Sequence, residues 1–312
     1  MEKELQVAGV KKLRATGHDS WLEARRSFVG GSDIAAIMSV SPWRTPFTVW
    51  CEKLGVSANK DTASMRYGRN NESRLLNELQ EELGEAWVLY RSPVTYMRGR
   101  LGANLDGLAV ADGKTLGVEI KTTRDAVAWS QVPLYYFLQV QHYMLVCNLE
   151  MFVVYAQGRG WRKHFFIEAS DETHALILKE VERFWAYVEK KEPPCMPCAD
   201  DKREVDYMVL AARAGLLRAM EDGDFEDACA LHLNAQKALK AAELAATAAK
   251  VNLIAGMGMN KEKTTNRWRV HLKEIKGECL DSVRFKADYP ELYAQYLIKS
   301  SYAQLSVKEI SC

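Results

Sequence analysis

Asp106, Glu119 and Lys121 are the residues of this sequence whose types and spacing can do chemistry. Asp106 belongs to an apolar, strand-like run, and Glu119 and Lys121 belong to the next such run. Side chains alternate between the faces of a strand, so Glu119 and Lys121 are expected to point the same way. The turn at residues 111–114 has the Asp-Gly pair typical of a hairpin, which would bring all three together. Two carboxylates beside an amine make a hard-cation site with its own base, as metal-assisted hydrolysis of a phosphodiester requires.

The Glu-x-Lys spacing alone is weak, because it is also typical of a solvated strand edge where the two side chains pair loosely. Two predicted helices, one upstream and one downstream of these residues, strengthen the functional interpretation. A helix predicted over 66–83 carries Glu72, and a helix predicted over 131–146 carries Gln139. Glu72 would supply a third carboxylate.

The turn Gly30-Gly31-Ser32 opens a helix predicted over Ile34 to Met38, with Ser32 or Asp33 as its N-cap. Ordinary helix capping explains this turn. A helix N-terminus with a hydroxyl and glycine amides also binds phosphate, and Arg25 lies upstream within reach of the same anion.

The order of predicted elements favours an α/β (α+β) fold, with a central mixed β-sheet flanked by helices. Short helices are expected near 21–26 and 47–54 in addition to those named above, and an amphipathic helix over 171–191. Strands are expected at 86–97, 101–110, 115–122, 150–157 and 161–168.

The Pro- and Cys-containing tract at 192–198 predicts a linker, so we expect a core domain over 1–195 and a C-terminal extension over 196–312. The extension should contain a helical hairpin, 204–221 and 225–255, followed by short strands near 267–275 and 302–310. Residues 237–286 hold eleven Lys and Arg against five Asp and Glu. That stretch would contact DNA or a partner, or form a solvated surface packed on the core.

Composition excludes few functions. The net charge is +1, so DNA binding would need a local basic patch rather than bulk charge. No apolar run is long enough for a membrane span and no signal peptide is evident. Seven cysteines without framework spacing indicate a reducing cytosol. Cys195 and Cys198 have the spacing of a metal-binding pair, but four ligands cannot be assembled locally because the next cysteine is Cys229, so no iron–sulfur cluster is expected.

Five segments, in order, resemble the motifs of the phage lambda exonuclease and YqaJ-type viral recombinase nuclease family, a branch of the PD-(D/E)xK superfamily. They are RRSFVGGSDIAAI at 25–37, YGRNNE at 67–72, ANLDGL at 103–108, VEIKT at 118–122 and YFLQVQHYM at 136–144. The sequence departs from the superfamily name at Leu105, where that name has proline.

This resemblance implies a two-metal site that uses Mg²⁺, with Mn²⁺ as a substitute. Asp106 would bridge two ions, and Glu119 with the backbone carbonyl of Ile120 would complete one shell. Glu72 would serve the second ion or its waters. Lys121 would orient or deprotonate the attacking water, with a pKa lowered by the neighbouring cations.

The resemblance also implies a pocket for the 5′-terminal phosphate, formed by Arg25 and Ser32 with help from Gln139. Asn104, beside Asp106, is a weaker DNA-binding candidate. Trp43 is expected either to stack on or wedge the DNA end, or to pack in the core or within a loop.

The implied activity is 5′→3′ exonuclease action on linear double-stranded DNA with 5′-phosphate ends, leaving 3′ single-stranded overhangs for homologous recombination. The implied partners are a phage-type single-strand annealing protein and two further copies of the chain in a homotrimer ring. The expected location is the cytoplasm of a bacterial or phage-infected bacterial cell. The alternatives are an endonuclease or junction resolvase of the same superfamily, and a non-catalytic DNA-binding recombination scaffold.

Overall fold

The structure, a computed structural model, describes residues 2–14, 17–56, 62–194, 202–273, 281–295 and 307. The chain divides into two compact units, Met1–Arg218 and Ala219–Cys312. Every residue that the sequence nominates for a site lies in the first unit.

A five-stranded mixed sheet lies at the centre of the first unit, in the order β3-β6-β7-β8-β9. β7 and β8 are parallel and the other neighbours are antiparallel. The strands are β3 (Val88–Arg91), β6 (Gly107–Ala111), β7 (Lys114–Thr122), β8 (Met151–Gly158) and β9 (Trp161–Glu168). The predicted mixed sheet is thus confirmed.

The hairpin of β6 and β7 forms at the predicted turn. Asp112 and Gly113 have φ of 44° and 78°, so both central residues are left-handed, as a tight two-residue turn requires. The register pairs Gly107 with Val118, next to Glu119. The turn therefore brings the start of β6 beside the carboxylate-bearing end of β7.

A second sheet, which the sequence did not reveal, has the order β1-β4-β5-β2. Its strands are β1 (Lys11–Leu13), β4 (Thr95–Arg98), β5 (Leu101–Asn104) and β2 (Val29–Gly30). The predicted strands 86–97 and 101–110 were each wrong as single strands, because each is broken where the chain passes between the two sheets. Asp106 lies in the bend between β5 and β6 rather than within a strand.

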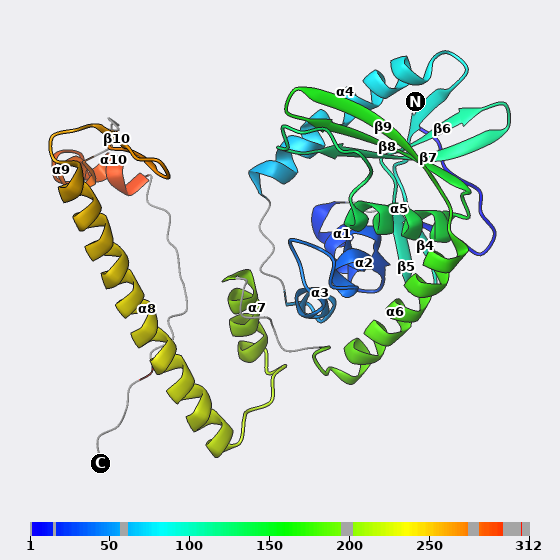
Figure 1. Cartoon of the computed structure of the whole chain (residues 1–312). Coiled ribbons are helices and arrows are strands. Elements are labelled where there is room, and N and C mark those ends of the chain that lie inside the picture. The colour runs from blue at the N-terminus through cyan, green and yellow to red at the C-terminus, as the bar shows by residue number, and fades with distance from the viewer. Residues whose placement is uncertain are drawn as a thin grey trace. The chain divides into compact units, whose positions relative to one another are not determined.

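Helices cover both faces of the central sheet (Figure 1). On one face α4 (Ala63–Leu83) buries Leu75, Leu76 and Leu79 against strand residues such as Val118 and Tyr155. On the other, α5 (Leu134–Cys147) connects the parallel strands β7 and β8, as a parallel pair requires. The larger core cluster joins α5 to α2 (Gly31–Ile37), α3 (Pro46–Lys53) and α6 (Asp171–Lys190).

The helices match their predicted positions with small shifts. α1 spans His18–Arg25, and α4 ends at Gly84, where φ is 80°. α2 differs from expectation at its start, since Gly30 is its N-cap rather than Ser32 or Asp33. Asp33 instead accepts a hydrogen bond from the Gly30 N–H at 3.0 Å from within the first turn.

The first unit extends beyond the predicted boundary after residue 195. α7 (Lys202–Arg213) packs on α3, burying Tyr207 and Ala211 in the larger core cluster. The Tyr207 hydroxyl donates to Glu52 Oε1 at 2.8 Å. α7 therefore belongs to the first compact unit, and the other helix of the expected hairpin belongs to the second.

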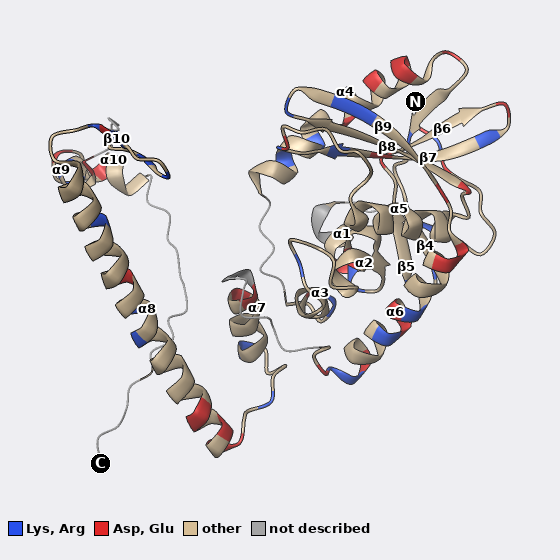
Figure 2. Cartoon of the chain, in the orientation of Figure 1, with Lys and Arg blue, Asp and Glu red and all other residues tan. Residues whose placement is uncertain are grey.

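The second unit contains α8 (Asp222–Met257), the hairpin of β10 (Glu262–Thr264) and β11 (Arg269–His271), α9 (Ser282–Asp288) and α10 (Pro290–Gln295). The strand predicted at 302–310 lies outside the described residues except for Val307. The described residues also exclude Cys195 and Cys198. Lys and Arg are interspersed with Asp and Glu along the elements of both units (Figure 2).

The helices in the described part of the chain include none with the length and apolar character needed to cross a membrane.

Candidate active site

The structure brings Asp106, Glu119 and Lys121 together beside Glu72. They line an open hollow of about 190 Å³. Its full lining is Gly68, Arg69, Glu72, Asp106, Glu119, Ile120, Lys121 and Thr122. Three elements therefore supply the site: α4, the bend before β6, and the end of β7.

Asp106 is tied to the strand that carries the other two residues. Its Oδ2 accepts a hydrogen bond from the Ile120 N–H at 2.7 Å. Leu105 is buried, 3% exposed, and anchors the bend. Burial, followed by the negative charges of Glu119 and Glu72, raises the pKa of Asp106 well above its usual value.

Glu119, Lys121 and Gln139 form a closed triangle of hydrogen bonds. Lys121 Nζ donates to Glu119 Oε1 at 2.5 Å and to Gln139 Oε1 at 3.1 Å. Gln139 Nε2 donates to Glu119 Oε1 at 2.7 Å and to the Tyr143 hydroxyl at 2.9 Å. Because the amide bridges both charges, Gln139 fixes how the carboxylate and the amine face each other.

The protein's own groups set the charge state of Lys121. Burial opposes its positive charge, but Glu119, Tyr136 and Asp106 outweigh burial and raise the pKa of Lys121 above its ordinary value. The lowered pKa expected beside bound cations stays a prediction. With the protein's own groups alone, carboxylates dominate the surroundings of the amine, which is therefore protonated at neutral pH.

The donor set fits a hard divalent cation. Glu119 Oε2 is buried and has no hydrogen-bond partner among the described residues. A buried anionic oxygen without a donor is costly, and a cation would satisfy it. Carboxylate oxygens of Asp106 and Glu119 and the Ile120 carbonyl are ligands that Mg²⁺ prefers.

Glu72 is placed less tightly. It lines the hollow from α4, and Arg91 lies 3.5 Å from its Oε1. Across the described ranges, no three Asp, Glu, His or Cys side chains converge closely enough to hold an ion by themselves. Asp106 and Glu119 are thus the central pair, and Glu72 would reach an ion through its waters.

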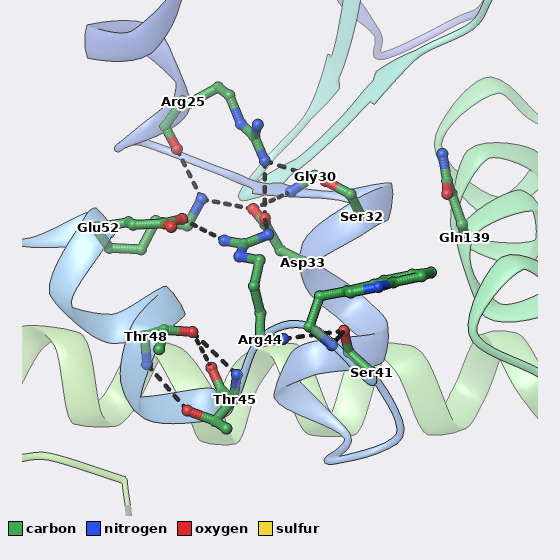
Figure 3. Close-up of polar contacts among 12 residues, drawn as sticks. Arg25, Gly30, Ser32, Asp33, Ser41, Arg44, Thr45, Thr48, Glu52 and Gln139 are labelled. Carbon is green, nitrogen blue, oxygen red and sulfur yellow. Dashed lines mark hydrogen bonds and ion pairs between the residues drawn. The ribbon is translucent and has the colours of Figure 1, made fainter. Parts of the chain in front are cut away.

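A second polar cluster surrounds the start of α2 (Figure 3). Asp33 is fully buried, and its Oδ1 accepts from Arg25 at 2.8 Å and from Arg44 at 2.7 Å. Its Oδ2 accepts from Lys53 at 2.8 Å. Burial alone would raise the pKa of Asp33, but the three cations hold it well below its usual range.

Sequence reasoning missed the roles of Asp33, Arg44 and Lys53 in this cluster. A signal was present, since Asp33 opens the otherwise apolar run Ile34–Ile37, where a buried acid needs cationic partners. The predicted neighbours Arg25 and Ser32 do meet: Arg25 donates to the exposed Ser32 hydroxyl at 3.3 Å.

The remaining candidates have partners of different kinds. Gln139 directs its amide to Glu119 and Lys121 rather than to Arg25 or Ser32. Its Cγ still lies next to the turn, since a Cβ added at Gly31 would come 3.0 Å from it. Asn104 accepts a hydrogen bond from Thr95. Trp43 is 48% exposed, so it is not a core residue.

Comparison with known proteins finds a similar family. Residues 20–150 match the model of the YqaJ-like viral recombinase domain, a stretch that contains every lining residue of the hollow. This part of the chain is therefore similar to that family, in line with the resemblance that the sequence motifs indicate. The chain is 28% identical over 179 residues to the uncharacterized protein YqaJ of Bacillus subtilis. That match covers 54% of this chain and 55% of the relative, so the chain spans about half the relative's length.

Solved structures similar to this chain include an alkaline exonuclease from Laribacter hongkongensis, with a TM-score of 0.45 and 19% identity over 63% of this chain and 99% of that one. A phage-related exonuclease from Haemophilus somnus has a TM-score of 0.43 and 11% identity, over 52% of this chain and 94% of that one.

Proposed function

We propose that this protein is a divalent-metal-dependent deoxyribonuclease that degrades one strand of linear double-stranded DNA in the 5′→3′ direction. The observation that carries the proposal is the convergence of Asp106, Glu119 and Lys121 on one hollow, together with the buried Glu119 Oε2, which has no hydrogen-bond partner among the described residues. The YqaJ-like domain supports a role in phage-type recombination.

Asp106, Glu119, the Ile120 carbonyl and Glu72 would hold Mg²⁺, two ions per site, with Mn²⁺ as a substitute. When bound, the ions supply Lewis-acid stabilisation of the attacking and leaving oxygens. Lys121 is protonated in this geometry, so its first task is to orient the attacking water. A role as base requires the cations to weaken its contact with Glu119.

The Arg25 and Ser32 pair supports dependence on a DNA end. Arg25, Arg44 and Lys53 carry three positive charges against the two negative charges of Asp33 and Glu52, which leaves the cluster cationic. A terminal phosphate would bind the exposed Ser32 hydroxyl and the Arg25 guanidinium. A closed pocket admits a strand end, whereas an internal phosphate continues on both sides.

Gln139 joins the two sites. It contacts the Gly31 turn through its aliphatic stem and the Glu119–Lys121 pair through its amide. The Gln139 side chain thus lies between the turn that carries Ser32 and the Glu119–Lys121 pair. This arrangement favours removal of nucleotides next to the 5′ end.

The product would be a 3′ single-stranded overhang for a phage-type single-strand annealing protein. We further propose a homotrimer ring as the working assembly, in the cytoplasm of a bacterial or phage-infected cell. Asn104 and Trp43 are proposed as two further DNA contacts, outside the residues that line the hollow.

An endonuclease of the same superfamily or a non-catalytic scaffold would use DNA differently. Incubation of the chain with linear duplex and with closed circular duplex, in Mg²⁺ or in EDTA, separates these activities. The exonuclease proposal expects loss of the linear duplex only, and only in Mg²⁺. Cutting of the circle favours the endonuclease, and binding without cutting favours the scaffold.

A further inference from the structure

Five aromatic side chains form an unbroken row beside the hollow: Trp43, Tyr135, Tyr136, Trp129 and Trp161. Ring centroids lie 4.9 Å apart for Trp43 and Tyr135, and 4.5 Å for Tyr135 and Tyr136. They lie 5.6 Å apart for Tyr136 and Trp129, and again 5.6 Å for Trp129 and Trp161. The rings come from three separate segments of the chain, so the fold assembles the row.

One end of the aromatic row is fixed by hydrogen bonds to a single residue. The indole N–H of Trp129 donates to Asp125 Oδ2 at 2.9 Å, and that of Trp161 donates to the Asp125 carbonyl at 2.9 Å. Gly158 leaves the space that Trp161 occupies, because a Cβ there would lie 2.1 Å from the indole. The Trp129 and Trp161 rings are thereby held in place before any ligand binds, which lowers the entropic cost of binding.

The aromatic row is open to solvent rather than part of the core. Trp43 is 48% exposed, and the other four rings are half-buried. The row meets the active site at its middle member, because Lys121 Nζ lies 4.4 Å from the centre of the Tyr136 ring. A ligand stacked on the row would therefore lie next to a residue that lines the hollow.

Positive charges accompany the aromatic row. Lys163 Nζ donates to the Trp129 carbonyl at 3.3 Å. Arg159 and Arg124 are exposed on either side of Asp125, whose backbone carbonyl also accepts from the Arg159 N–H at 2.9 Å. The Asp125 carboxylate accepts a hydrogen bond from the Trp129 indole N–H. The backbone N–H of Asp125 donates to the Thr123 hydroxyl. Solvent-accessible aromatic rings beside basic side chains, here one exposed ring and four half-buried ones, are the kind of surface on which single-stranded nucleic acid stacks its bases.

We propose that the aromatic row binds unpaired nucleobases of single-stranded DNA by stacking, next to the nuclease hollow. The inference rests on the proposed function for the identity of the strand, and it adds a base-binding surface to the phosphate and metal sites. Stacking tolerates every base, so the row suits an enzyme that must move along any sequence.

The test compares two oligomers of equal length, a single-stranded oligodeoxynucleotide and its abasic counterpart, which keeps the phosphates and lacks the bases. Affinity is measured in EDTA, so that nothing is cut, with the wild-type chain and the variants Trp43→Ala, Trp43→Phe and Leu134→Ala. Leu134 is 57% exposed on the same helix as two of the rings and controls for loss of apolar surface.

We expect the wild-type chain to prefer the base-bearing oligomer, and Trp43→Ala to lose roughly ten-fold of affinity for it alone. Trp43→Phe should retain most of the preference, and Leu134→Ala all of it. Equal binding of the two oligomers by the wild-type chain overturns the proposal. An unchanged preference of Trp43→Ala for the base-bearing oligomer also overturns the proposal. The aromatic row would then be a surface that contacts protein rather than DNA bases. Cutting of linear duplex by the wild-type chain in Mg²⁺ is scored separately, so failure of the nuclease activity and failure of the row are distinguishable.

Discussion

Asp106 accepts a hydrogen bond from the backbone N–H of Ile120 at 2.7 Å, which joins the bend between two sheets to the C-terminal part of β7. Residues from both elements therefore line one hollow. Every prediction about the site depends on this bond and on the Gln139 triangle.

Replacing Asp106 with Asn should separate activity from stability. The amide oxygen of the variant can still accept a hydrogen bond from the Ile120 N–H. The carboxyl whose ionisation Glu119 and Glu72 disfavour is no longer present. We expect cutting to fall below detection. In EDTA we expect the free energy of unfolding to rise, because the amide removes the unfavourable ionisation of a buried carboxyl beside Glu119 and Glu72. Urea denaturation measures the free energy of unfolding. A variant less stable than the wild-type chain would show that the Asp106 carboxyl does not destabilise the folded state.

Lys121→Ala should abolish cutting and leave DNA binding intact. The amine contacts Glu119 and Gln139 and lies within the hollow, whereas phosphate binding is assigned elsewhere. Gel-shift affinity in EDTA and digestion in Mg²⁺ report the two properties. Lys179→Ala, exposed on α6 and outside every proposed DNA contact, is the matched loss of one positive charge. Wild-type cutting by Lys121→Ala would refute the site.

Ser32→Ala and Arg25→Ala should erase the preference for 5′-phosphorylated over 5′-hydroxyl ends. Charge-assisted hydrogen bonds contribute about 1.5–3 kcal/mol each, so a loss of roughly ten-fold or more in initiation on phosphorylated ends is expected. Ser32 is exposed, so its variant should fold normally. Arg26→Ala, one residue from Arg25 and exposed, should keep the preference. A preference that survives both changes places the end-binding pocket elsewhere.

His142 should make stability depend on pH. Burial lowers its pKa to about 4, below the ordinary value of 6.5, although the Gly102 carbonyl opposes the shift. Between these values the unfolded chain binds the proton and the folded chain does not, so stability falls as pH is lowered through this window. The loss is about 3 kcal/mol at most. Urea denaturation from pH 7 to pH 4 measures the slope, and His142→Gln should flatten it. An equal slope in the variant would contradict the assignment.

The sequence predicted local elements well where one pattern dominated. Turn chemistry alone predicted the Asp112–Gly113 turn. Periodicity alone predicted the long helix α4 and the strands β8 and β9. The passage from β5 to β6 was not predictable in this way. A continuous apolar run gives no sign that Leu105 is buried at a bend between two different sheets.

The candidate site was predictable in its members more than in its bonds. Spacing and motif order nominated Glu72, Asp106, Glu119 and Lys121, which line one hollow. The Gln139 amide between Glu119 and Lys121 depends on how α5 packs across the sheet, a tertiary relationship that spacing does not encode. The same holds for Asp33, whose three cations come from three different segments.

Digestion of linear duplex DNA labelled at one 5′ end or at one 3′ end tests the central claim most directly. With 5′-phosphorylated ends and Mg²⁺, the proposed activity releases the 5′ label first as mononucleotide, while the 3′ label stays on long strands until late. EDTA and the Glu119→Ala variant should release neither label. Earlier release of the 3′ label, or wild-type release by Glu119→Ala, would contradict the proposed 5′→3′ metal-dependent exonuclease.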